Sequence, residues 1–144
     1  MQRVLVAVSA IAFIVVFYAC KKSNDAPSNA RTVQNFSGSY NYTGLSYSSG
    51  STVINTFDSL DACEKDNILK FNTDLTYNFI DTGTVCAPPE GGQGDWNLSA
   101  NGDSLYLDSD AAFIKSWDGK TLVVTDVVQT VPVLITATTT LVKK

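Results

Sequence analysis

Short apolar–polar alternations separated by tight turns recur from Phe36 to the end of the chain, and they constrain the fold more than any other feature of the sequence. In residues 75–80 (LTYNFI), Leu75, Tyr77 and Phe79 fall on one face of an extended strand, because successive side chains of a strand point to opposite faces. Segments of this kind predict strands rather than helices. The others lie at residues 36–47, 52–57, 67–72, 96–98, 105–107, 113–117, 121–125 and 131–142.

Turn-forming dipeptides separate these segments. Thr73-Asp74 lies between residues 67–72 and 75–80, and Asn101-Gly102 and Asp118-Gly119 are hairpin signals, because these residue types tolerate positive φ. We count eight to nine strands and no amphipathic helix, so the sequence predicts an all-β antiparallel meander. Closure into a barrel of about eight strands removes the unpaired edges of an open sheet. A β-sandwich is the alternative.

The first nineteen residues have the pattern of a secretory signal peptide. Arg3 supplies one positive charge, residues 4–19 (VLVAVSAIAFIVVFYA) are uncharged and mostly apolar, and Ala19 is a small residue at the end of the run. This is the order of a positively charged segment, an apolar segment and a cleavage site. The run is slightly short for a bilayer span, which takes about 20 residues. An uncleaved transmembrane anchor is the alternative.

Residues 17–20 (FYAC) resemble a lipobox, in which a small residue precedes a cysteine that is acylated and becomes the new N-terminus. Phe17 and Tyr18 depart from the Leu and the small residue that are usual there. In such lipoproteins an acidic residue after the cysteine often retains the protein in the inner membrane. This chain has Lys21 at that position, so the resemblance implies the outer membrane. More than one acyl chain would anchor the protein, since a single chain holds only marginally.

The chain therefore divides into three parts. Residues 1–19 are predicted to be the signal peptide, residues 20–35 a lipid-anchored flexible linker, and residues 36–144 one β domain. The linker prediction rests on a polar composition with Pro27 and several Ser and Asn residues, which is typical of linkers.

Charge and the absence of histidine exclude several functions. From residue 20 onward the chain has nine basic and fourteen acidic residues, a formal charge of −5. This argues against nucleic acid as a partner, because phosphates require clustered Lys or Arg. The whole chain lacks histidine, which removes the Ser-His-Asp and Cys-His catalytic schemes and His-ligated zinc sites. No nucleophile–base pair can be named, so we predict a protein that is not an enzyme and has no cofactor or metal.

Cys63 and Cys86 remain once Cys20 is assigned to the lipid. An exported chain folds in an oxidising compartment, so this pair predicts a disulfide, contributing about 3 kcal/mol in the chain-entropy model.

Four acidic residues crowd the loop around Cys63, and they lack the spacing of a calcium-binding loop. We predict a solvated acidic loop, with a calcium site as the alternative, formed by Asp58, Asp61, Glu64 and Asp66.

Residues 61–72 (DACEKDNILKFN) resemble the C-x-K-D-D-x-L-x-F segment of lipocalin-like domains in bacterial lipoproteins. In that family a turn, a T-Y-x-F strand, a second cysteine, a G-x-W-x-L strand and an L-x-L strand follow. Here they are TYNF, Cys86, GDWNL and LYL. Leu75 stands where the turn commonly has Gly, and Tyr40 where the opening motif has Trp. The resemblance covers most of residues 36–126, and it implies a lipocalin-like barrel and a cysteine pair but no particular ligand.

Four aromatic side chains are candidates to line a ligand cavity, namely Phe71, Tyr77, Phe79 and Trp96. The alternative, which we prefer, is that they are core, because small barrels fill themselves with side chains. Period-two placement predicts that they point inward together with Leu75, Leu98, Leu105 and Leu107. So many large side chains leave at most a shallow pocket, near residues 87–94 (APPEGGQG), which are predicted to be a connecting loop or a lid.

These observations predict an outer-membrane lipoprotein, held on the membrane by its N-terminal lipid, with a non-catalytic lipocalin-like domain. One hypothesis is a binding module for a small apolar ligand. The alternative is a filled barrel or a sandwich that acts as a surface interaction module for another envelope protein or a glycan. Because of the bulky interior, we expect weak or no binding of fatty acids or retinoid-like probes.

Overall fold

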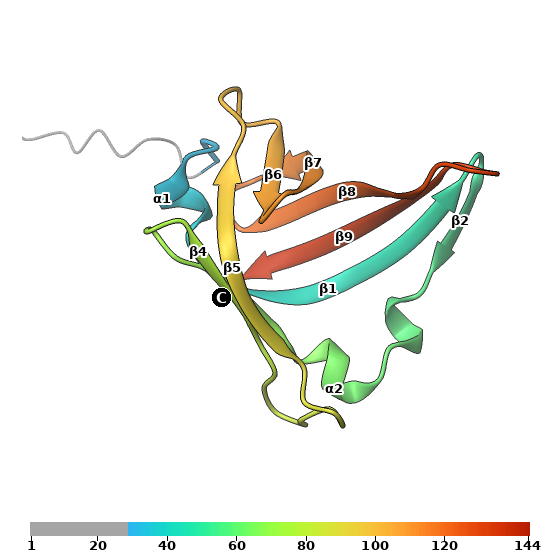
Figure 1. Cartoon of the computed structure of the whole chain (residues 1–144), viewed down its shortest axis with the longest axis horizontal. Coiled ribbons are helices and arrows are strands. Elements are labelled where there is room, and N and C mark those ends of the chain that lie inside the picture. Colours follow the sequence, from blue (N-terminus) through green and yellow to red (C-terminus); the bar gives the residue numbers. More distant parts are fainter. Residues whose placement is uncertain (1–28) are drawn as a thin grey trace, which may run out of the picture.

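The structure, a computed structural model, describes residues 29–144; the predicted signal peptide and Cys20 lie outside the described residues. One antiparallel sheet of nine strands has the order β2-β1-β3-β4-β5-β6-β7-β8-β9, and β1 also pairs with β9. Eight strands thus close into a barrel, and β2 is an additional strand on the edge of β1 (Figure 1). The strands are β1 (Gly38–Ser49), β2 (Thr52–Asn55), β3 (Ile68–Phe71), β4 (Thr76–Ile80), β5 (Gly91–Leu98), β6 (Ser104–Leu107), β7 (Asp110–Trp117), β8 (Thr121–Gln129) and β9 (Ile135–Lys143).

The predicted all-β antiparallel barrel is therefore confirmed. Three single-turn helices accompany it, α1 (Val33–Phe36), a 3-10 helix η1 (Phe57–Ser59) and α2 (Ala62–Lys65). Thr32 caps α1 by accepting a hydrogen bond from the Asn35 N–H through its side chain. Glu64 Oε2 accepts from the Asp61 N–H at the start of α2. Such caps satisfy the free donors of a first helical turn.

The tight turns follow the predicted residue types, with one correction. Asn101-Gly102 lies in the β5–β6 hairpin, and Asp118 accepts from the Lys120 and Thr121 N–H groups in the β7–β8 hairpin. The predicted strand at 75–80 instead starts at Thr76, because Leu75 has a φ of +68° and ends the turn. Leu75 is 36% exposed and lies outside the buried cluster, contrary to the predicted inward position. It occupies a left-handed conformation that usually favours Gly.

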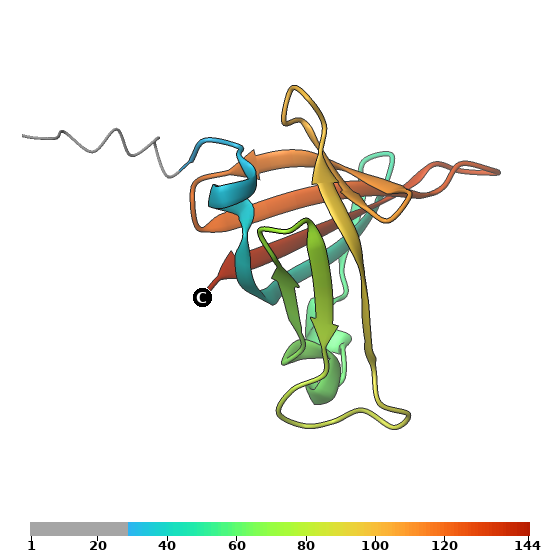
Figure 2. The same ribbon diagram turned by 60° about the vertical axis from the view of Figure 1, so that its left-hand side comes forward.

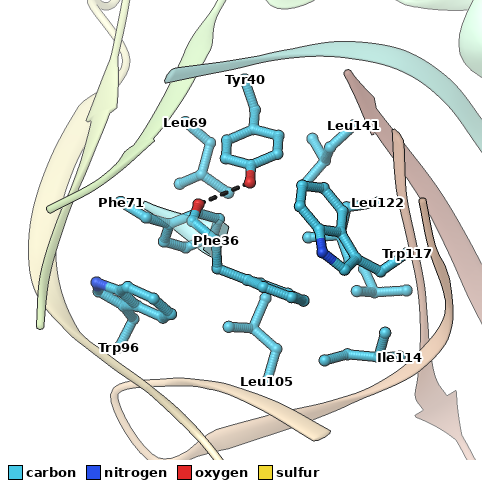
Figure 3. Packing of buried hydrophobic residues seen from close by; sticks show 11 residues of the cluster. Phe36, Tyr40, Leu69, Phe71, Trp96, Leu105, Ile114, Trp117, Leu122 and Leu141 are labelled. Atoms are coloured by element: carbon cyan, nitrogen blue, oxygen red, sulfur yellow. Dashed lines mark hydrogen bonds between the residues drawn. The ribbon is translucent and has the colours of Figure 1, made fainter. Parts of the chain in front are cut away.

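A cluster of buried side chains fills one half of the barrel (Figure 3). Phe36 reaches into it from α1 and is fully buried, with its ring centroid 4.7 Å from that of Trp117. The Tyr40 O–H donates to the Phe36 carbonyl over 2.6 Å. The cluster consists of Phe36, Tyr40, Leu69, Phe71, Trp96, Leu105, Ile114, Trp117, Leu122, Val124 and Leu141. Helix α1 is thus a plug at this end of the barrel.

Residues that precede the predicted domain boundary at residue 36 contact the barrel. Arg31 Nη1 lies 2.7 Å from Asp103 Oδ1 and also donates to the Gly102 carbonyl. Val33 packs against the buried cluster. The last residues of the predicted linker therefore contact the barrel, because Phe36 needs the α1 turn to enter the core.

The other end of the barrel is less completely paired. Strand β5 pairs with β6 only over Trp96–Leu98, and β8 pairs with β7 only up to Thr125. Gly91–Gly94 and Asp126–Gln129 therefore have a strand neighbour on one side only. In both ribbon views, β3–β5 run away from the β1, β8 and β9 ribbon toward this end (Figures 1 and 2). We call it the open end.

Candidate functional site

The four aromatic residues predicted to line a cavity divide into two pairs. Phe71 and Trp96 are each 1% exposed and belong to the buried cluster, with ring centroids 4.9 Å apart. The Trp96 indole N–H donates to the Asn72 carbonyl over 2.9 Å, which satisfies the one polar atom of this side chain. These two residues hold the plugged half together, and at 1% exposure each offers very little surface to a ligand.

Tyr77 and Phe79 lie toward the open end and are only partly buried. They are the cross-strand partners of Phe71 and Leu69, and so share the inward face. Phe79 packs edge-to-face against Tyr42, with ring centroids 6.1 Å apart.

Glycines on β5 face this aromatic group. Tyr77 pairs with Gly94, and Phe79 pairs with Gly92. A Cβ at Gly92 would meet nothing within 4 Å, so there is open space on this stretch of β5. We name Tyr42, Tyr77 and Phe79, together with these two glycines, the open-end site. It is a partly exposed aromatic surface with open space beside Gly92 and the Asp108 carboxylate beside Gly94.

Asp108 gives the open-end site its polar contact. Its Oδ2 accepts from the Tyr77 O–H over 2.9 Å, and its Oδ1 accepts from the Asp95 N–H over 3.0 Å. A side chain at Gly94 would collide with this carboxylate, so glycine is needed there. The contact depends on the turn after β6, where Asp108 has a φ of +53°.

Both tyrosines of the open-end site stay protonated at neutral pH. The hydrogen bond to Asp108 is the main cause that raises the pKa of Tyr77, and the nearby charge of Asp110 adds to it. Burial raises the pKa of Tyr42, with a further contribution from Tyr77. The phenol groups can therefore donate or accept hydrogen bonds, and neither is activated as a base.

Two shallow hollows lie next to this site. One of about 300 Å³ is lined by Asp74, Leu75, Asp95, Trp96, Asn97 and Asp108. The other, of about 260 Å³, is lined by residues 76–78 and 93–95. Carboxylates recur in these linings, and neither contains Lys or Arg. A fatty-acid carboxylate would meet like charge here, whereas a neutral or cationic polar group would not.

The predicted disulfide between Cys63 and Cys86 is confirmed. It joins α2 to the segment before β5, with the two Cα atoms 5.2 Å apart. Asp81 Oδ2 accepts from the Cys86 and Glu90 N–H groups and so fixes the same segment. The predicted loop at 87–94 is shorter than expected, because β5 already begins at Gly91.

Two of the acidic residues around Cys63 have local roles. Glu64 caps α2, and Asp66 Oδ2 accepts from the Thr84 N–H over 2.8 Å. Within residues 29–144, no group of three or more His, Cys, Asp or Glu residues is placed to hold a metal ion. No helix in this part of the chain is long and apolar enough to cross a membrane.

Sequence reasoning missed Tyr42 and Asp108. The alternation of Tyr40 and Tyr42 signals that both tyrosines share the inward face of β1. No local pattern identifies Asp108, because its role depends on β5 and β4 lying beside the turn.

Comparisons with protein-family models, with curated proteins and with solved structures found no match. The resemblance to lipocalin-like lipoproteins therefore rests on the sequence motifs alone.

Proposed function

We propose that this protein is a lipid-anchored lipoprotein of the cell envelope, facing the periplasm or the cell surface from the outer membrane. Its lipocalin-like barrel is a non-catalytic binding or interaction module that works through its surface and its open end. The observation that carries this proposal is the filling of one half of the barrel by eleven buried side chains, with Phe36 as a plug. Such an interior leaves little room for an enclosed ligand.

Two features support the envelope part of the proposal. Residues 17–20 resemble a lipobox and follow a signal-like segment, which assigns Cys20 to acylation. The Cys63–Cys86 disulfide fits an exported chain, because such bonds persist in oxidising compartments. The membrane partner in this proposal is reached through the N-terminal lipid.

The chemistry of the side chains supports a non-catalytic role. The chain has no histidine to act as a general base near neutral pH. The raised pKa values of Tyr42 and Tyr77 keep both groups neutral rather than nucleophilic. Recognition of another envelope protein or a glycan by exposed loops and by the open end needs neither property.

The open-end site favours one second candidate, a small-ligand carrier. Tyr77 and Phe79 are partly exposed beside the space at Gly92. Aromatic faces with a carboxylate nearby suit an amphipathic ligand that is neutral or cationic. A ligand of this kind would lie across the open end and would not enter the plugged half.

Metabolic labelling with an alkyne fatty acid tests the anchor. The parent chain should be labelled and Cys20→Ser should lose the label, whereas the control Cys63→Ser/Cys86→Ser should keep it. A Cys20→Ser chain that is still membrane-bound would support a transmembrane anchor instead.

An environment-sensitive apolar dye, together with native mass spectrometry of protein purified from its own membrane, tests the filled interior. We expect neither a co-purifying small molecule nor saturable dye binding. Stoichiometric dye binding below about 1 μM, or about −8 kcal/mol, requires a real cavity and would favour the carrier function.

A further inference from the structure

Two neighbouring hairpins form an apolar tip at the end of the molecule opposite α1. Strands β2, β1, β9 and β8 are consecutive in the sheet, so the β1–β2 and β8–β9 hairpins project side by side. Both ribbon views place their turns far from the plugged end, with the β8–β9 turn reaching furthest (Figures 1 and 2). The tip exposes the large apolar side chains of Tyr47, Val53, Ile54, Val127, Val128, Val131, Val133 and Leu134.

The apolar surface surrounds the tip instead of covering one side of it. Val53 is 66% exposed and Ile54 is 58% exposed, and as neighbours in β2 they point to opposite faces of the sheet. Val131, at the turn, is 78% exposed. The docking face of a rigid protein would cover one face of such a ribbon, whereas fluid lipid can surround both.

Charge is absent from the same segments. Residues 36–57 and 127–142 contain no Asp, Glu, Lys or Arg, although the chain as a whole is acidic. Charged groups are costly in the apolar part of a bilayer, and an uncharged segment avoids that cost. Because the tip has no positive charge, an anionic surface would not attract it. The tip is instead suited to contact the apolar and uncharged part of a lipid interface.

A small hollow lies on the β1–β2 hairpin, where it adjoins the start of β9. It has a volume of about 120 Å³, is mainly apolar, and is lined by Tyr47, Ser48, Ser49, Thr52, Ile54 and Ile135. Its lining suits a short stretch of acyl chain. Strand β2 pairs only with β1, so its outer backbone edge needs water or another partner. This edge restricts any insertion to the interfacial depth, where water is available.

We propose that the apolar tip inserts into the interface of a lipid bilayer and forms a second membrane contact besides the proposed Cys20 lipid. The geometry permits both contacts on one membrane. β1, with twelve residues, spans about 40 Å, and the ten residues between Cys20 and Arg31 can span up to about 35 Å. A barrel lying on its side would reach the surface with its tip, and an upright barrel would present the tip to an opposing membrane.

A fluorescent label at the tip tests this proposal in the full-length chain, purified from membranes and reconstituted in phosphatidylcholine vesicles. Val133→Cys receives an environment-sensitive thiol label, and Phe113→Cys, at a 56% exposed position on β7, is the matched control. The unsubstituted chain treated with the same reagent gives the background. Nitroxide-labelled lipid is placed either in the same vesicles or in separate vesicles added afterwards, and iodide serves as the aqueous quencher.

We expect lipid nitroxide to quench the label at position 133 in at least one arrangement, and iodide to quench it several-fold less than the label at position 113. Adding Val131→Asp and Leu134→Asp should reduce the lipid-contacting population about tenfold or more, whereas adding Phe113→Asp should leave it unchanged. Salt and anionic lipid should have little effect.

Equal iodide quenching at positions 133 and 113 in both arrangements overturns the proposal. So does shielding from iodide that occurs without lipid quenching and disappears on dilution, because a second copy of the chain would then cover the tip. The label at position 133 reports on the tip and fatty-acid labelling reports on Cys20, so failure of one proposal is distinguishable from failure of the other.

Discussion

Replacing Phe36 with alanine tests whether α1 is an integral part of the barrel. The Phe36 side chain is fully buried, packs against Trp117 at 4.7 Å and comes from the turn whose carbonyl accepts the Tyr40 O–H. Removing a buried phenylalanine costs about 3–5 kcal/mol, because apolar contacts are lost and a cavity remains. This is a large share of the roughly 5–15 kcal/mol that holds an average domain folded, so Phe36→Ala should remove a substantial part of the domain's stability.

Urea unfolding under non-reducing conditions measures this effect, with circular dichroism as the probe because Phe36 lies beside a tryptophan. The control is Phe113→Ala, at a 56% exposed position on β7, which should change the free energy of unfolding by no more than about 0.5 kcal/mol. If Phe36→Ala unfolds at the same urea concentration as this control, then α1 does not close the barrel and the domain begins at β1.

Two further predictions concern the disulfide and the tyrosines. Replacing Cys63 and Cys86 with serine should lower the free energy of unfolding by about 3 kcal/mol; an unchanged urea midpoint relative to the oxidised parent would contradict this. Burial raises the pKa values of Tyr40 and Tyr42 in the folded state. Unfolded tyrosine ionises at about pH 10, so the two groups contribute their full stabilisation below that pH. The contribution is lost as the pH rises further through the raised pKa values of the folded state. Phenolate absorbance of Tyr40 and Tyr42, obtained as the difference between the parent chain and the Tyr40→Phe/Tyr42→Phe variant, should therefore appear together with unfolding. Ionisation of either group near about pH 10 with an intact circular dichroism spectrum would refute the assignment.

Much of the barrel could be predicted from local patterns. Turn chemistry at Asn101-Gly102 and Asp118-Gly119 marked two hairpins, because these residues suit tight turns wherever they occur. Period-two alternation predicts the inward face that carries Phe71 and Trp96. In a sheet with one buried face, every second side chain points to that face and is apolar. The two cysteines available for pairing predicted the disulfide without any knowledge of the fold.

Features that depend on contacts distant in sequence could not be predicted in this way. A one-turn helix such as α1 is too short to show helical periodicity, so the sequence predicts that Phe36 begins a strand. Because glycine is depleted in strands, the sequence predicts a loop at Gly91–Gly94, yet backbone pairing with β4 makes this segment part of β5. Leu75 adopts a positive φ that its residue type disfavours, and only the surrounding turn imposes it.

The composition of the apolar tip calls for an explanation outside folding. Strand β9 contains Thr136, Thr138, Thr139 and Thr140, and threonine forms strands as readily as valine does. The valines and the leucine at the β8–β9 turn are exposed. They therefore contribute no buried apolar area and do not stabilise the folded domain. The neighbouring β2 also has none of the charges or prolines with which proteins protect a sheet edge. An uncharged apolar tip beside an unprotected edge invites association with other copies of the chain, and insertion into a lipid interface would remove that hazard while using the same residues.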